Sequence, residues 1–206
     1  MRRRQPRTEP ATRERPRQQS LEVGDDGWLA GVRRLPSPNC DGRPTGTTID
    51  TVIVHHISLP PERFHGDAVE RLFTNTLDHA AHPWFERLRG VRVSAHLLVR
   101  RHGGVVQFVS CDQRAWHAGQ SQLLGRERCN DFSIGIELEG SSLRPFTASQ
   151  YRRLEALLGA LARRYPLTLI AGHSDVAPGR KEDPGPLFDW QALAPILRAT
   201  GIRRPY

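Results

Sequence analysis

The sequence of 206 residues has few cysteines, a single methionine and no long hydrophobic stretch. Its three cysteines, Cys40, Cys111 and Cys129, form no Cys-x-x-Cys pair and leave an odd number, which argues against a disulfide framework and favours reduced thiols. No run of about 18 apolar residues is present to cross a membrane, and the start has no apolar core of a secretory signal. We therefore expect a cytoplasmic protein with no membrane partner.

Acidic residues are scarce in the first twenty positions, where seven arginines and two glutamates account for five of the eight net positive charges. Three prolines and very few apolar residues there predict disorder. We expect residues 1–22 to be a disordered arginine-rich N-terminal extension and 23–206 to be a single domain, because 37% apolar residues can bury one sizeable core. The extension can attract phosphates weakly, but no nucleic-acid-binding motif accompanies it, so no specific nucleic acid partner is expected.

The segment 172–186 gathers His173, Lys181 and Asp183 among repeated prolines and glycines. This composition excludes a regular helix and favours turns, and loops on a rigid scaffold often carry binding residues. Histidine nitrogen and aspartate oxygen are ligands that zinc accepts, and a lysine beside a metal can stabilise an oxyanion. The segment therefore indicates one side of a metal site.

A β-branched apolar run predicts a buried strand over residues 51–57, which ends at His55 and His56 before two prolines. Either histidine can supply a further ligand, or can be an ordinary hydrogen-bonded side chain at a strand end. Successive strand residues point to opposite faces, so the pattern alone does not choose between them.

A further strand is expected over residues 132–140, where Glu137 and Glu139 share one face and apolar residues form the other. A carboxylate on this face, within reach of a metal-bound water, would be a general base. The alternative is an edge strand with a solvated acidic face.

The remaining pattern predicts strands near 94–100, 105–109 and 167–171, helices near 67–76 and 149–164, and a last helix beginning after Asp189. Thr147 and Gln150 have the spacing of a capping box. Together these elements indicate an α/β (α+β) fold with a central mixed sheet flanked by helices.

These motifs resemble those of the zinc-dependent N-acetylmuramoyl-L-alanine amidases of the peptidoglycan-recycling type, which are related in fold to the peptidoglycan recognition proteins. The similarity extends over residues 27–197, and its most specific blocks are 27–29, His55 with 57–60, 92–96, 114–119, 125–140 and 173–186. It implies a central mixed sheet flanked by helices. It also implies hydrolysis of the amide bond between N-acetylmuramic acid, preferably in the 1,6-anhydro form, and L-alanine. An anhydromuropeptide is thus the expected partner, with the protein a monomer.

The resemblance implies that His55, His173 and Asp183 bind zinc and that Glu137 and Lys181 are catalytic. Three protein ligands would leave zinc one position for water, whose pKa the metal lowers towards about 7. Glu137 would take the water's proton and pass it to the leaving amine, while the metal and Lys181 hold the oxyanion.

The resemblance also places Arg92, Trp116 and Arg128 near the substrate, where arginine suits the carboxylates of the stem peptide and tryptophan offers a flat apolar wall. Ordinary surface arginines and a core tryptophan are the alternatives. His96 is expected either to form a hydrogen bond that supports a metal ligand or to be a hydrogen-bonded core histidine. No catalytic role is assigned to His117.

The chain departs from many recycling amidases at His56, where those have asparagine. A non-catalytic peptidoglycan-binding or sensing module is the alternative function, and loss of a metal ligand would be its usual mark. An exported amidase of broad specificity would share the same site.

Overall fold

Six strands form one mixed sheet at the centre of the protein. The computed structural model of the chain describes residues 21–206. The strands lie in the order β1 (Arg33–Arg34), β5 (Val105–Gln107), β4 (Leu97–Val99), β9 (Ser133–Glu139), β3 (Thr51–Ile57) and β10 (Leu169–Gly172). Only β4 and β5 pair antiparallel, and the other neighbours are parallel. The prediction of a central mixed sheet is confirmed.

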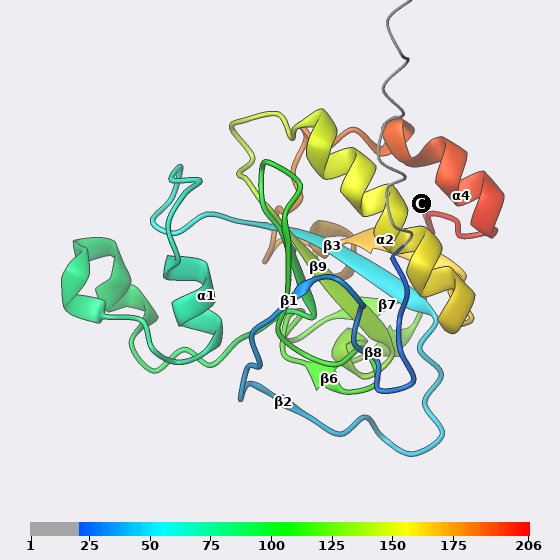
Figure 1. The fold of residues 1–206 in the computed structure, drawn as a ribbon, viewed down its shortest axis with the longest axis horizontal. Helices are drawn as coiled ribbons and strands as arrows, with labels where there is room; N and C mark the ends of the chain where they lie inside the picture. The colour runs from blue at the N-terminus through cyan, green and yellow to red at the C-terminus, as the bar shows by residue number, and fades with distance from the viewer. Residues whose placement is uncertain (1–20) are drawn as a thin grey trace, which may run out of the picture.

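Helices flank this sheet, as predicted. The α-helices are α1 (Ala68–Phe73), α2 (Ala148–Arg164), α3 (His173–Val176) and α4 (Ala194–Thr200). Short 3-10 turns are η1 (His79–Ala81), η2 (Pro83–Leu88), η3 (Cys129–Asp131) and η4 (Trp190–Leu193). Two small ribbons complete the fold, β2 (Cys40–Asp41) with β6 (Arg114–Ala115) and β7 (Gln122–Leu123) with β8 (Arg126–Glu127). Figure 1 shows α2 and α4 together over one side of the sheet, with α1 apart from them.

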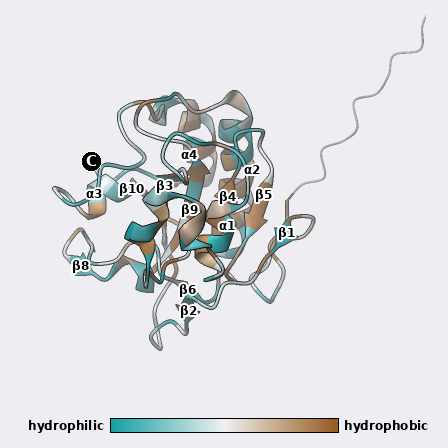
Figure 2. Cartoon of the chain, turned by 90° about the vertical axis from the view of Figure 1, so that its left-hand side faces the viewer, coloured by the Kyte–Doolittle hydropathy of each residue, from teal (hydrophilic) through white to brown (hydrophobic). Residues whose placement is uncertain are grey.

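Helix α2 covers one face of the sheet because its leucines recur at helical spacing. Leu154, Leu157, Leu158 and Leu161 are fully buried against the apolar residues of β3 and β9. The predicted capping box is present: the Thr147 hydroxyl accepts from the Gln150 N–H, and the Gln150 side chain accepts from the Thr147 N–H. Figure 2 shows the resulting contrast between a brown interior and the teal strands β1 and β8 at the periphery.

The opposite face of the sheet carries the polar residues. In β3 and β9, the residues that alternate with those facing α2 include His55 and Glu137, which are directly paired across the parallel ladder. Both glutamates of β9 are buried, Glu137 at 8% and Glu139 at 3% exposure, because this strand lies between β3 and β4. The alternative interpretation from the sequence, an edge strand with a solvated acidic face, is therefore wrong.

Two boundaries differ from the prediction. Leu21 is buried in the main core and its carbonyl accepts from Arg163, so the fold already includes the end of the predicted extension 1–22. Residues 1–20 of that extension lie outside the described residues. The segment 172–186, expected to contain no helix, begins with the single helical turn α3. Helix is possible there because Pro178 and Gly179 come only after this turn, and the Asp175 carboxylate accepts from the Gly172 N–H at 2.8 Å.

Candidate metal centre and active site

Three predicted ligands meet at one edge of the sheet. His55 lies near the end of β3, His173 is the first residue after β10, and Asp183 returns from the following loop. Parallel neighbours bring β3 and β10 to the same edge, with Gly172 opposite Val54, so the two histidines are side by side. His55, His173 and Asp183 are only 1%, 3% and 8% exposed.

The three side chains present a tight triangle of ligand atoms. The Nδ1 atoms of His55 and His173 are 3.0 Å apart, and each is 3.1 Å from Oδ2 of Asp183. Zinc bonds of about 2.0–2.1 Å in a tetrahedron place neighbouring ligand atoms about 3.3 Å apart, so this triangle is close to the size that zinc requires. These residues also form the one group of histidine, cysteine and acidic side chains within residues 21–206 that has the spacing of a metal site.

The electrostatics of the triangle suit a cation. Burial lowers the pKa of His55 to about 4, so its imidazole is neutral and can offer a lone pair. Burial would raise the pKa of Asp183, but hydrogen bonds from His173 and His55 outweigh it and hold that pKa well below its usual range. Two imidazole nitrogens and one carboxylate oxygen are a common zinc ligand set.

The structure separates the two adjacent histidines. His55 joins the triangle, whereas the Nε2 atom of His56 lies 3.0 Å from the Ser142 hydroxyl. Ser142 lies in the loop that follows β9, so this loop provides the partner of His56. The alternating strand pattern did not distinguish the two histidines, but their contacts do.

Glu137 is positioned beside the triangle by the strand register that pairs it with His55. Its Oε2 atom is buried and has no hydrogen-bond partner among the described residues. Burial raises the pKa of this carboxyl well above its ordinary value, the Asp183 carboxylate raises it further, and Lys181 lowers it. A buried carboxylate that has no partner, next to a candidate metal site, is typical of a group reserved for a reacting molecule.

Lys181 is the only lysine in the sequence, and it is exposed. Its positive charge lowers the pKa of both Glu137 and His55, which places the ammonium near the triangle. Lys181 and Asp183 line the same hollow of about 580 Å³, together with His56 and residues 179, 180 and 182.

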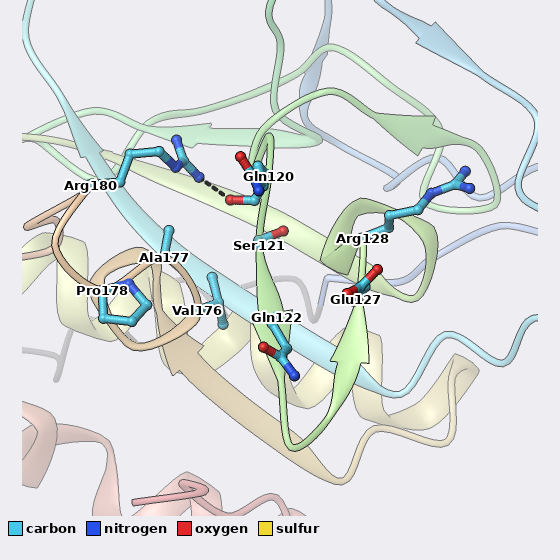
Figure 3. A pocket seen from close by; sticks show the side chains of 9 residues that line it. All are labelled: Gln120, Ser121, Gln122, Glu127, Arg128, Val176, Ala177, Pro178 and Arg180. Carbon is cyan, nitrogen blue, oxygen red and sulfur yellow. Dashed lines mark hydrogen bonds between the residues drawn. The ribbon is translucent and has the colours of Figure 1, made fainter.

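None of the three predicted substrate residues is hydrogen-bonded to the triangle within residues 21–206. Arg128 is exposed, has a left-handed backbone (φ 59°) and pairs with Asp131 at 3.2 Å. Figure 3 shows it at the rim of a hollow of about 390 Å³ between the β7–β8 ribbon and the end of α3. Arg92 is exposed, and the half-buried Trp116 is linked to Ser94 by two hydrogen bonds of 3.1 and 3.2 Å.

His173 has supports that sequence reasoning missed. Its Nε2 atom lies 3.1 Å from the Ala118 carbonyl, which also accepts from Arg180 at 2.7 Å. On the other side of α3, Asp175 accepts from Arg204 at 2.7 Å, and this guanidinium stacks 3.9 Å over the Trp190 ring. The loop that contains Ala118 therefore fixes the His173 side chain, and the C-terminal segment that contains Arg204 fixes the helical turn α3.

His96 is a satisfied core histidine. It is fully buried, its Nδ1 atom accepts from the Gly135 N–H at 2.9 Å, and its Nε2 atom lies within 3.1 Å of the Gln113 carbonyl and the Arg43 guanidinium. His117, to which the sequence assigned no role, is instead the histidine that contacts the Nε2 atom of His55.

The fold and this site define a class: an α/β domain with a candidate metal site of two histidines and one aspartate and an adjacent unpaired carboxylate, an arrangement typical of metal-dependent hydrolases. Comparison with known proteins gives the particular family. The family model "N-acetylmuramoyl-L-alanine amidase" matches residues 45–186. The chain belongs to the N-acetylmuramoyl-L-alanine amidase family, as the sequence motifs predicted.

Its relatives are similar over most of their length. The 1,6-anhydro-N-acetylmuramyl-L-alanine amidase AmpD of Escherichia coli K12 is 54% identical over 81% of this chain and 92% of the relative. The AmpD protein of Haemophilus influenzae is 46% identical, again over 81% and 92%. A crystal structure of an AmpD selenomethionine derivative matches with a TM-score of 0.79 and 51% identity, covering 84% of this chain and 97% of that one. The amidase AmiD of E. coli, solved with anhydro-N-acetylmuramic acid-L-Ala-D-gamma-Glu-L-Lys, matches with a TM-score of 0.52 and 28% identity, over 89% and 66%.

Proposed function

We propose that this protein is a zinc-dependent amidase that hydrolyses the bond between 1,6-anhydro-N-acetylmuramic acid and L-alanine in muropeptides during peptidoglycan recycling. The observation that carries the proposal is the buried triangle of His55, His173 and Asp183 beside the unpaired carboxylate of Glu137. The names of the AmpD relatives, at 46–54% identity, support the anhydromuropeptide as substrate.

Zinc is the metal that fits the site best, because two imidazoles and one carboxylate at this spacing leave room for a further ligand. A zinc ion held by His55, His173 and Asp183 would supply a water of lowered pKa and polarise the amide carbonyl. The protein's own contribution is to hold both imidazoles in place and to keep the imidazole of His55 neutral.

Glu137 is proposed as the general base and then the general acid. Its buried Oε2 atom is free to accept a proton from the attacking water, and its raised pKa means that the proton can be held there until the amide nitrogen leaves. A carboxyl with an ordinary pKa would release that proton more readily to solvent. Its position across the ladder from His55 keeps Glu137 on the rigid part of the sheet.

Lys181 is proposed to stabilise the oxyanion that forms on the amide carbonyl. Lys181 is exposed on the loop that leads to the buried Asp183. Its ammonium can therefore adjust its position to the substrate while the Asp183 carboxylate stays in place. A positioned cation at a developing oxyanion typically contributes a few kcal/mol.

Two surroundings of the centre differ in charge, which suggests how the substrate lies. Arg92 and Arg128 are exposed, and with Trp116 they are proposed to contact the anionic stem peptide. A separate hollow of about 500 Å³ lined by His56 has no arginine or lysine in its lining, which includes Glu62, Glu182, Trp84 and serine hydroxyls. Such a surface suits the hydroxyl groups and apolar face of a sugar better than the anionic stem peptide.

A cytoplasmic location is proposed with this role, and all three cysteines are unpaired, as a reducing compartment would leave them. Within residues 21–206, no helix combines the length and apolar character that spanning a membrane needs.

The direct test is peptide release from 1,6-anhydro-N-acetylmuramoyl-tripeptide, followed by mass spectrometry with and without chelator. Release that depends on zinc and is lost in Glu137→Ala would support the proposal. The matched substrate is the same muropeptide with a reducing, non-anhydro sugar, which should be cleaved more slowly. Zinc binding without cleavage of either substrate would favour a peptidoglycan-binding module, and absence of zinc binding would refute the metal site.

A further inference from the structure

His117 is a buried histidine that contacts one of the candidate metal ligands. Its Nδ1 atom lies 3.0 Å from Nε2 of His55, and the two rings meet edge to face with centroids 5.1 Å apart. His55 faces His173 and Asp183 with its other nitrogen, Nδ1. The contact with His117 therefore occupies the only remaining polar atom of the His55 ring.

The neighbours of His117 fix where the protons lie. If Nδ1 of His55 offers its lone pair to a metal, Nε2 carries the hydrogen and donates it to Nδ1 of His117. His117 then has its own hydrogen on Nε2, which lies 3.3 Å from the Ser133 hydroxyl oxygen. That hydroxyl has one hydrogen, and it donates this to the Cys129 carbonyl at 2.5 Å, because a carbonyl can only accept. The hydrogen bonds thus run in one direction, from His55 through His117 and Ser133 to the backbone.

The sheet is shaped to receive this ring. Gly135 occupies the middle of the buried strand β9, where a glycine normally weakens a strand. A Cβ atom on Gly135 would lie 2.4 Å from Cγ and 2.6 Å from Nδ1 of His117, distances that no side chain tolerates. The ring of His96 also packs edge to face against that of His117, with centroids 5.6 Å apart. His117 is therefore held by steric contact as well as by hydrogen bonds.

An imidazole acceptor differs from the carboxylates that often orient zinc-binding histidines. It fixes the ring and its tautomer, as such outer partners do, but adds no negative charge behind the ligand. Asp183 then remains the single anionic ligand, so a bound dication keeps a net positive charge towards the substrate.

We propose that His117 is a positioning residue that holds His55 in the orientation and tautomer needed to bind the metal, with Ser133 fixing His117 and Gly135 providing the space. The inference rests on the proposed metal role of His55. It adds to that role the hydrogen bonds from His55 through His117 to Ser133, which lie outside the set of metal ligands.

The test is zinc affinity, measured by competition with a chromogenic chelator. His117→Phe keeps a ring of similar size but removes the acceptor, and we expect its zinc Kd to rise about 10–100-fold. His117→Gln, whose side-chain oxygen can accept from Nε2 of His55, should restore part of this loss. The absorption bands of the cobalt-substituted protein should shift in His117→Phe and return towards wild type in His117→Gln, and kcat should fall more than KM rises.

Two further variants test the same ring without altering it. Gly135→Ala should weaken zinc binding because the new Cβ displaces His117, and Ser133→Ala should weaken it less. Gly159→Ala in α2 is the matched control, because its Cβ would have only ordinary contacts beyond 3.5 Å, and it should leave zinc Kd unchanged. These variants keep the proposal testable if His117→Phe does not fold.

The outcomes separate the two proposals. If His55→Ala abolishes zinc binding while His117→Phe and Gly135→Ala keep the wild-type Kd within twofold, the positioning role is refuted and the metal site stands. If His55→Ala itself binds zinc as well as wild type does, the metal site fails, and the role of His117 fails with it.

Discussion

Replacing Glu137 by glutamine should make the metal-free protein more stable, and it should abolish amide hydrolysis by the zinc-loaded protein. Burial raises the pKa of this carboxyl well above its usual value, Asp183 adds to the rise, and Lys181 opposes it. The folded protein therefore binds a proton at Glu137 more tightly than the unfolded chain does, in which a glutamate has a pKa of about 4.3. The resulting stability is fully present below that unfolded pKa and is lost as pH rises through the folded pKa.

The size of the effect follows from the burial. Glu137 is 8% exposed, and its Oε2 atom has no hydrogen-bond partner among residues 21–206. An unpaired buried polar group costs about 1–3 kcal/mol, and a charged one costs more, so the ionised form at pH 8 should cost at least this amount. Glutamine has the same shape without the charge. Because each kcal/mol shifts the Tm of a domain of this size by about 2–4 °C, Glu137→Gln should melt several degrees above wild type at pH 8.

Thermal melts in chelator at pH 4 and pH 8 are the assay. Glu139→Gln is the matched control on the same strand, because the Glu139 carboxylate accepts from Arg100 at 2.6 Å and from the Arg101 N–H at 3.1 Å. That variant should be destabilised at pH 8. A Glu137→Gln Tm that exceeds wild type equally at both pH values, or falls below it at pH 8, would refute the reasoning. Added zinc should reduce the difference in Tm between Glu137→Gln and wild type at pH 8, since a nearby dication stabilises the ionised carboxylate.

Three further outcomes are expected. Arg100→Met should lower the unfolding free energy by about 3–5 kcal/mol in urea titrations, because this guanidinium joins the buried carboxylates of Glu70 and Glu139 at 2.6 Å each. Lys181→Met should lower kcat about 10²–10³-fold in peptide-release assays, while zinc Kd stays at the wild-type value, since the lysine is no ligand. Removing zinc with a chelator should lower the Tm, and stoichiometric zinc should restore it, because a ligand that binds only the folded state stabilises it.

Local patterns in the sequence predict much of the fold. The β-branched run of β3, the leucine spacing of α2 and the Thr147 cap each depend on residues a few positions apart, and all three are present. The three candidate metal ligands are also predicted, through resemblance to a family, and parallel pairing explains why residues 118 positions apart in the chain meet. The predicted strand near 94–100 shortens to β4 (Leu97–Val99), because the Ser94 N–H bonds the Trp116 carbonyl outside the sheet.

What the sequence does not predict are partners that depend on distant loops. Glu137 and Glu139 look equivalent by period, yet Arg100 pairs with Glu139 and leaves Glu137 unpaired. The alternation of a strand reports which face a side chain is on and contains no information about which loop will contact that face. Chemical roles of identical residues on one face therefore diverge through tertiary contacts alone.

The same limit explains why His117 was missed, and it shows where a signal was present. His117 and His55 are 62 residues apart, and no periodic pattern connects them. Gly135, however, interrupts an otherwise well-packed strand at the residue opposite Ile53, two positions before Glu137. A glycine costs stability in a buried strand, so it persists where another group needs the space. Here that group is the His117 ring, and the interrupted strand marks the place where the sheet leaves space for a side chain that contacts a candidate metal ligand.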